Sequence, residues 1–191
     1  HWAVYLDEPD TASLLVSSGA AVNAVNRYGV TPLSLAATNG NANLITLLLD
    51  AGANAQASLR GGETILMTAA RTGSLESVEA LLLKGANPNK RERNNQTALM
   101  WAAGYSNDTP AGEALNTIDL LLDRDANFDM KDNRGQTALM TAAQMNHSEV
   151  VKTLLNAGAR ADLRNKEGRT AVDLARGAGS LAALRVLGEA K

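Results

Sequence analysis

Residues 29–37 read Gly-Val-Thr-Pro-Leu-Ser-Leu-Ala-Ala, and residues 47–54 read Leu-Leu-Leu-Asp-Ala-Gly-Ala-Asn. The hydroxyl of Thr31 can accept a hydrogen bond from an unpaired N–H group in the first turn of a helix. Pro32 then stands at the first helical position, where its missing N–H costs nothing. Gly52 suits the left-handed backbone that commonly follows a helix. The two segments therefore predict two helices joined by a short connection.

The same pattern recurs along the whole chain. The threonine that opens each first helix recurs at steps of 33, 33, 40 and 33 residues, at Thr31, Thr64, Thr97, Thr137 and Thr170. A pair that closes each second helix keeps the same steps, at Gly19-Ala20, Gly52-Ala53, Gly85-Ala86, Asp125-Ala126 and Gly158-Ala159. Self-similarity at such a period is the signature of a repeat protein. We therefore expect a single domain over residues 1–191.

The apolar residues indicate that each unit consists of helices. In one second helix, Val78, Leu81 and Leu82 follow helical spacing. Four of the first helices carry a pair of small residues that lets a neighbouring helix approach closely, at Ala36-Ala37, Ala69-Ala70, Ala102-Ala103 and Ala142-Ala143. The chain is 45% hydrophobic but only 3% aromatic, so Leu, Ala, Val and Met must fill the core. An all-α fold of closely packed helices follows.

These residues closely resemble the ankyrin repeat, and the resemblance covers essentially the whole chain. It implies a solenoid of stacked helix-turn-helix units, each with a β-turn fingertip, a short inner helix and a longer outer helix. It also implies a non-catalytic module that binds another protein through its concave face. The predicted units are a truncated repeat 1–25, repeats 26–58, 59–91, 92–131 and 132–164, and a terminal repeat 165–191.

The register predicts how the chain begins. A step of 33 residues back from Ser34 reaches His1, where the family usually carries the His of a Thr-Pro-Leu-His motif. The chain then begins inside an inner helix, and we expect the natural protein to have further sequence upstream. The segments 64–67 and 137–140 also resemble bacterial ankyrin proteins, some of which are exported. The resemblance leaves both a cytoplasmic and a periplasmic location open.

The 40-residue step carries seven more residues than the others. Alignment from both sides places this insertion near residues 107–113, where Pro110 and Gly112 in a polar run predict a surface loop. One interpretation is a tolerated loop, because loop closure costs rise slowly with length. The other is a loop that contacts the partner, since it follows Trp101 and Tyr105.

Two kinds of substitution within the pattern give further expectations. Asn95 and Asn146 replace glycines at turns, and we expect them to adopt the left-handed conformation that Asn tolerates. Methionine recurs at the position of the family's usual His, at Met67, Met100 and Met140. Because Met fills irregular gaps in cores, packing is favoured there over a binding stripe.

No catalytic or cofactor site is expected. His1 and His147 lie in widely separated repeats, and both are explained by the repeat pattern. The chain has no cysteine and no Gly-x-x-x-x-Gly-Lys phosphate loop. Its net charge of −2 gives no basic field for nucleic acid, and no apolar run approaches the roughly 20 residues that span a membrane. We expect a monomer without cofactor or metal that binds neither nucleic acid nor membrane.

The fingertips offer a first candidate binding surface. The first variable residue of each turn is basic in four of five cases, at Arg27, Arg60, Arg93, Asn133 and Lys166; the four basic residues are here called the basic row. Tyr28 and Arg134 stand beside them. Stacked repeats place successive tips about 10 Å apart. Such a row would steer an acidic segment of a partner protein, although exposed turns are commonly polar without any partner.

The ends of the inner helices offer a second candidate surface. They contribute Thr38, Asn39, Arg71, Thr72, Gly104, Tyr105, Gln144 and Met145. Because interface energy concentrates on Trp, Tyr and Arg, Arg71 and Tyr105 are the favoured anchors, and Trp101 either packs or binds. Three alternatives remain: a regulatory or sensor domain that controls an attached or partner enzyme, a structural spacer, and an enzyme whose ligands the sequence does not reveal.

Overall fold

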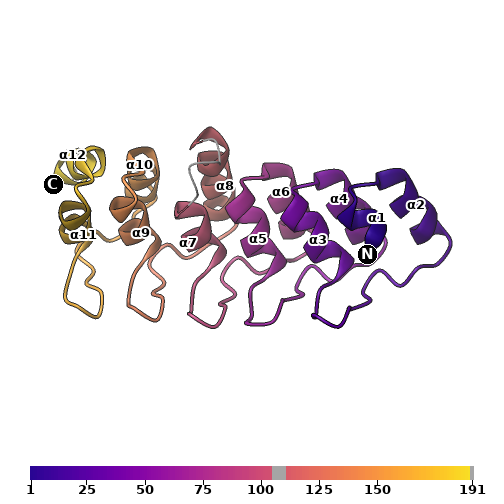
Figure 1. Cartoon of the computed structure of the whole chain (residues 1–191). Helices are drawn as coiled ribbons and strands as arrows, with labels where there is room; N and C mark the ends of the chain where they lie inside the picture. The colour runs from indigo at the N-terminus through magenta and orange to yellow at the C-terminus, as the bar shows by residue number, and fades with distance from the viewer. Residues whose placement is uncertain (105–110, 190–191) are drawn as a thin grey trace.

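The computed structural model describes residues 1–104 and 111–189, which form alternating inner and outer helices (Figure 1). The inner helices are α1 (Trp2–Tyr5), α3 (Pro32–Asn39), α5 (Ile65–Thr72), α7 (Ala98–Ala103), α9 (Ala138–Gln144) and α11 (Ala171–Ala178). The outer helices are α2 (Pro9–Ser17), α4 (Ala42–Asp50), α6 (Leu75–Leu83), α8 (Ala111–Asp123), α10 (Ser148–Asn156) and α12 (Leu181–Glu189).

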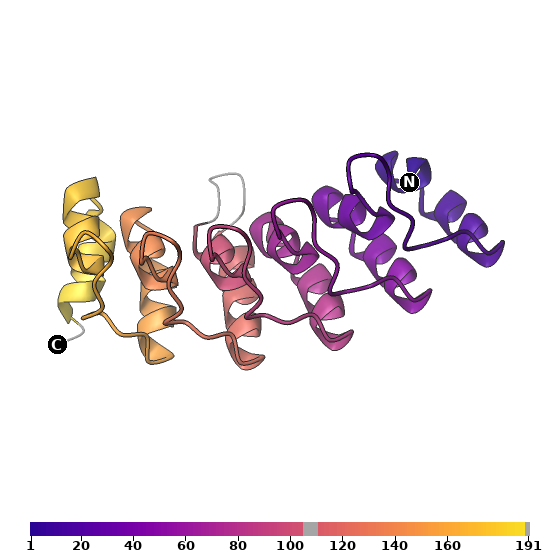
Figure 2. The same cartoon turned by 90° about the horizontal axis from the view of Figure 1, so that it is seen from below.

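The helix pairs stack side by side into an elongated solenoid. The turns between units project along one edge (Figure 1), and the row of units curves with the inner helices on its concave side (Figure 2). Inner helices contact inner helices and outer helices contact outer helices of the next unit, as α5 does with α7 and α4 with α6. In the described ranges, β pairing is limited to one bridge between Ser58 and Thr64. The predicted all-α solenoid is confirmed.

Local chemistry begins and ends the helices as expected. Each opening threonine accepts a hydrogen bond from the backbone N–H three residues later, at 3.1 to 3.4 Å. Asn95 and Asn146 adopt positive φ of 60° and 62°, which confirms the left-handed conformation predicted for them. Asp125 at the end of α8 takes the same conformation, with φ of 61°.

The core runs continuously through the stack. Its buried apolar residues form one cluster that extends from Ala3 to Leu187. Met67, Met100 and Met140 all belong to it, so the prediction that they pack in the core is confirmed. The alanine pairs of the inner helices are fully buried, so these small side chains lie at the contacts between helices.

The insertion differs from its prediction. Helix α8 has 13 residues, whereas α4, α6 and α10 have nine. It begins at Ala111, four positions before Leu115, which the register aligns with the first residue of α6. Residues 111–113 are therefore helical rather than a loop, because alanine and glutamate favour a first helical turn. Residues 107–110 lie outside the described part of the chain.

Side-chain amides join the loops that follow successive outer helices. The Asn23 amide donates to the Gly52 carbonyl at 2.9 Å, and its oxygen accepts from the Asn54 amide at 2.8 Å. Asn89 repeats this pair of bonds with the Asp125 carbonyl and the Asn127 amide, at 2.8 and 2.7 Å. Each such pair, here called an amide strap, aligns one unit with the next.

Both histidines also join neighbouring units. His1 Nε2 lies 3.0 Å from the Val30 carbonyl, and His147 Nδ1 lies 3.0 Å from the Ala103 carbonyl. In each case the ring binds the backbone of an adjacent unit. The geometry therefore supports a structural role for both side chains.

The last inner helix has a titratable capping contact. The Thr170 backbone amide and hydroxyl both donate to the Asp173 carboxylate at 2.9 Å, which lowers the pKa of Asp173. Because the folded pKa is the lower one, this contribution is present above about pH 4 and is lost as the pH falls through the folded pKa. We expect Asp173→Asn, which keeps an acceptor oxygen, to lose less stability than the wild type below pH 4. Urea unfolding at pH 6, 4 and 3 measures this, and identical pH profiles would contradict it.

Candidate functional site

Backbone hydrogen bonds hold four of the fingertips in line. The Arg93 amide donates to the Gly61 carbonyl at 2.8 Å, and the Asn133 amide donates to the Asn94 carbonyl at 2.8 Å. The Lys166 amide continues the series to the Arg134 carbonyl at 2.9 Å. The last three positions of the predicted tip series are therefore each bonded to the preceding tip.

The residues of the basic row differ from other basic residues nearby because no carboxylate pairs with them among the described residues. Arg27, Arg60, Arg93 and Lys166 are exposed, and no ion pair engages them within the described residues. Arg27 lies over the ring of Tyr28, with its guanidinium carbon 4.7 Å from the ring centroid. All four charges therefore remain available to a partner.

Other polar tip residues serve the fold. Lys90 donates to the Gln56 carbonyl at 2.8 Å, and Lys131 donates to the Arg164 carbonyl at 2.9 Å. The predicted site residue Arg134 pairs with Asp132 of its own turn at 3.3 Å. Asn133 donates to the Arg93 carbonyl at 3.1 Å. These contacts tie Arg134 and Asn133 to the fingertips themselves.

On the inner-helix face, Arg71 and Trp101 meet at one pocket. The Arg71 guanidinium carbon lies 6.0 Å from the centroid of the Trp101 ring. They line a pocket of about 270 Å³ together with Gln96, Met100, Gly104 and Thr141. A side chain at Gly104 would crowd this space, since an added Cβ would lie 3.0 Å from the Thr141 methyl group.

Trp101 combines packing with exposure to this pocket. Its half-buried ring packs against the core, and its Nε1 is buried without a hydrogen-bond partner among the described residues. Both interpretations of Trp101 are therefore compatible with its position. The other predicted anchor, Tyr105, lies outside the described residues.

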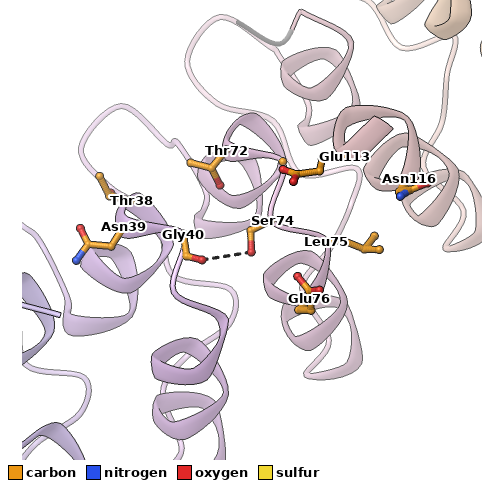
Figure 3. A pocket seen from close by; sticks show the side chains of 10 residues that line it. Thr38, Asn39, Gly40, Thr72, Ser74, Leu75, Glu76, Glu113 and Asn116 are labelled. Carbon is orange, nitrogen blue, oxygen red and sulfur yellow. Dashed lines mark hydrogen bonds between the residues drawn. The ribbon is translucent and has the colours of Figure 1, made fainter. Parts of the chain in front are cut away.

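A second pocket gathers three of the predicted site residues. Thr38, Asn39 and Thr72 line an open pocket of about 440 Å³ between the ends of α3 and α5 and the start of α8 (Figure 3). Ser74 Oγ donates to the Gly40 carbonyl at 3.4 Å across it. Asn39 also holds the first unit, because its amide donates to the Val4 carbonyl at 3.0 Å.

Sequence reasoning missed the acidic side of this pocket. Glu76 of α6 and Glu113 of α8 both line it, and both side chains are exposed. Glu113 reaches the pocket because α8 starts four residues early. The signal for this was the Ala-Gly-Glu sequence at the end of the insertion, which suits a helix start as well as a loop.

Gln144 and Met145 lie apart from both pockets. They end α9 and are exposed, Met145 by 52%. The Gln144 carbonyl accepts a hydrogen bond from Ser180 Oγ at 3.0 Å, which joins α9 to the last unit. The predicted inner-helix residues therefore spread along the stack rather than converge on one cavity.

Comparison with known proteins identifies the family. Family models described as ankyrin repeats (three copies) match residues 1–92, 53–115, 81–165 and 110–191. The chain is an ankyrin-repeat protein. Ankyrin repeats are generally protein–protein interaction modules and typically are not catalytic. A search of curated proteins finds no match.

The ankyrin solenoid presents charges of opposite sign at the two ends of its inner helices. The basic row stands at the turns before the inner helices begin, and the pocket with Glu76 and Glu113 stands where α3 and α5 end. An eight-residue helix is about 12 Å long. The two charged regions therefore lie about one inner-helix length apart.

Among the described residues, no group of three or more His, Asp or Glu side chains is arranged to hold a metal ion. No described helix combines the length and hydropathy needed to cross a membrane.

Proposed function

We propose that this ankyrin domain is a non-catalytic binding module that holds an acidic segment of a partner protein along its basic row and inner-helix face. The observation that carries the proposal is the set of exposed basic side chains at four of the five tips, three of them consecutive. Local carboxylates neutralise none of them within the described residues, whereas Arg134, Arg160 and Arg169 are paired.

The two parts of the surface would contribute differently to binding. Exposed ion pairs contribute only about 0.2 to 1 kcal/mol each, so the basic row sets orientation and association rate more than affinity. Affinity would come from desolvated contacts near Arg71 and Trp101, because interface energy concentrates on such side chains. Regulation of an attached or partner enzyme would be one use of the same module.

The positions of the histidines support a role without catalysis. A general base must reach the proton that it abstracts. Both rings instead contact backbone carbonyls of neighbouring units at 3.0 Å. The typically non-catalytic character of the family points the same way.

The test reverses part of the basic row. The partner is first captured with the complete chain, identified by mass spectrometry and then titrated calorimetrically against the purified protein. We expect the triple variant Arg27→Glu, Arg60→Glu and Arg93→Glu to weaken binding about ten- to hundredfold in 50 mM salt, because three attractions become repulsions. Its affinity should also depend less on salt between 50 and 200 mM. In the wild type, salt screens the attraction between the basic row and the acidic partner, and the variant lacks that attraction.

The control makes the same charge change on the outer-helix side. Arg124→Glu, Lys152→Glu and Arg185→Glu alter the net charge equally, and we expect them to leave the affinity within about threefold of wild type. Circular dichroism should show unchanged helicity for both variants. Equal affinities of the two triple variants in 50 mM salt would refute the role of the basic row.

A further inference from the structure

A groove lies on the outer helices, away from the surfaces described above. The outer helices α4 and α6 are neighbours that contact each other (Figure 1), and the groove between them has a volume of about 350 Å³. Leu49, Ala80 and Leu83 give it an apolar surface. Its other lining residues are polar or charged: Thr46, Asp50, Glu76, Glu79 and Lys84. This outer groove is separate from the basic row and from the inner-helix face.

Leu83 is the unusual residue of the outer groove. Beyond residue 28, three large apolar side chains are well exposed among the described residues, and Leu83 is the most exposed of them at 70%. A lone leucine on a protein surface is common. The same register position is polar in all five other units, however, with Ser17, Asp50, Asp123, Asn156 and Glu189. The packing of a unit therefore does not require leucine here, and the side chain is available to contact another molecule.

The residues of α6 that line the groove lie on one face of the helix. Glu76, Glu79, Ala80 and Leu83 follow the spacing i, i+3, i+4 and i+7. With a rise of about 1.5 Å per residue, Glu76 and Leu83 lie about 10 Å apart along the helix. The outer groove therefore has an acidic end near Glu76 and an apolar end near Leu83.

The charge of the acidic end is not neutralised within the described part of the chain. Glu76 and Glu79 are exposed, and neither takes part in an ion pair there. Lys84, the one basic side chain that lines the groove, pairs with Asp50 at 2.9 Å. Glu76 also lines the pocket that contains Glu113 (Figure 3), so the acidic surface continues toward α8.

The sign of the outer surface changes along the stack. The register position of Glu79 is occupied by Asp119 in α8, but by Lys152 in α10 and by Arg185 in α12. All four side chains are exposed. A positively charged segment would therefore be attracted to α6 and repelled from the last two units.

We propose that the outer groove binds a basic segment of a second partner protein. An apolar side chain of that segment packs against Leu83 and Leu49, and its Lys or Arg side chains pair with Glu76 and Glu79. A separation of about 10 Å corresponds to about three residues of an extended chain, so the basic residues lie close to the apolar one in sequence. Charge complementarity selects this occupant, because the same carboxylates repel nucleic acid and acidic protein segments. The inference is independent of the basic row, which attracts the opposite charge.

The test selects the segment without assuming its sequence. The complete chain is immobilised and offered a displayed library of random peptides of about twelve residues, and peptides that also bind the Leu83→Asn variant are removed. Asparagine occupies this register position in α10, so the variant should keep the urea unfolding midpoint of the wild type. We expect the remaining peptides to carry an apolar residue with at least two Lys or Arg residues within about four positions of it.

The selected peptides are then synthesised and titrated against purified variants. We expect Leu83→Asn to weaken binding about tenfold or more, because most of the burial of a leucine side chain is lost. The double variant Glu76→Gln and Glu79→Gln should weaken binding about three- to tenfold in 50 mM salt, and the difference from wild type should disappear in 500 mM salt. The matched control Glu8→Gln and Glu149→Gln removes the same charge at the starts of α2 and α10. We expect it to leave the affinity within about twofold of wild type.

Three results would overturn the proposal. The first is that no peptide in the library depends on Leu83, and the second is that the peptides that depend on it are acidic or uncharged. The third is an equal effect of the Glu76 and Glu79 substitutions and of the control substitutions on affinity. Sedimentation of the complete chain tests the remaining occupant: a dimer that Leu83→Asn abolishes would assign the outer groove to a second copy instead.

Discussion

Replacing Gly135 by alanine is expected to destabilise the chain by about 3 kcal/mol or more. Gly135 has φ of +77°, and an added Cβ would lie 2.9 Å from the Lys166 amide nitrogen and 3.2 Å from Asn165 Cα. These neighbours are backbone atoms of the next fingertip, which cannot rotate away. Relief would require breaking the Lys166–Arg134 hydrogen bond that aligns the two tips.

The variant Gly168→Ala measures how much stability is lost through the positive φ alone. The difference from Gly135→Ala then gives the loss caused by the contact with the next fingertip. Gly168 has nearly the same φ, +76°, but an added Cβ would meet nothing within 4 Å. We expect this variant to lose only about 1 to 2 kcal/mol, the usual cost of a left-handed alanine. Urea unfolding at neutral pH measures both losses. Equal losses would show that the next fingertip moves freely, and the inferred rigidity of the tip series would then be wrong.

The sequence was sufficient where structure depends on neighbouring residues along the chain. The hydroxyl of Thr31 accepts a hydrogen bond from the backbone three residues later, and Asn95 adopts the left-handed conformation that its residue type tolerates. Such local preferences recur in every unit, so the period and the order of helices could be predicted together. The burial of Met67 followed as well, because Met100 and Met140 share its register position and are also buried.

The candidate site was less predictable because it depends on contacts between units. Lys90 and Arg93 look equivalent in sequence, but only Lys90 reaches a carbonyl of the preceding unit. The pocket that contains Glu76 and Glu113 needs three units in their final positions. Its acidic character also depends on the early start of α8, where helix and loop have similar local signals. Whether a charged side chain bonds to the next unit or stays exposed can be determined only when the positions of the stacked units are known.

Contacts between stacked units also determine which leucine substitutions lower the free energy of unfolding most. Leu81 is fully buried in α6, which contacts both α4 and α8, whereas Leu83 of the same helix is 70% exposed. We expect Leu81→Ala to cost about 3 to 4 kcal/mol through lost burial and the cavity left behind. Leu83→Ala should cost less than about 0.5 kcal/mol. Chemical denaturation measures both values, and a similar cost for the two would contradict the packing described for α6.

The loss of stability caused by Leu81→Ala should also change the order in which the units unfold. Stability in a repeat array is the sum of each unit's own stability and its contacts with its two neighbours. Leu81→Ala weakens the middle of the array, so the units before and after α6 become less coupled. Hydrogen exchange should then show faster exchange in α3 and α4 than in α9 and α10, because the former retain fewer stacked neighbours. A uniform acceleration along the whole chain would mean that the units unfold as one block, and nearest-neighbour coupling would not describe this solenoid.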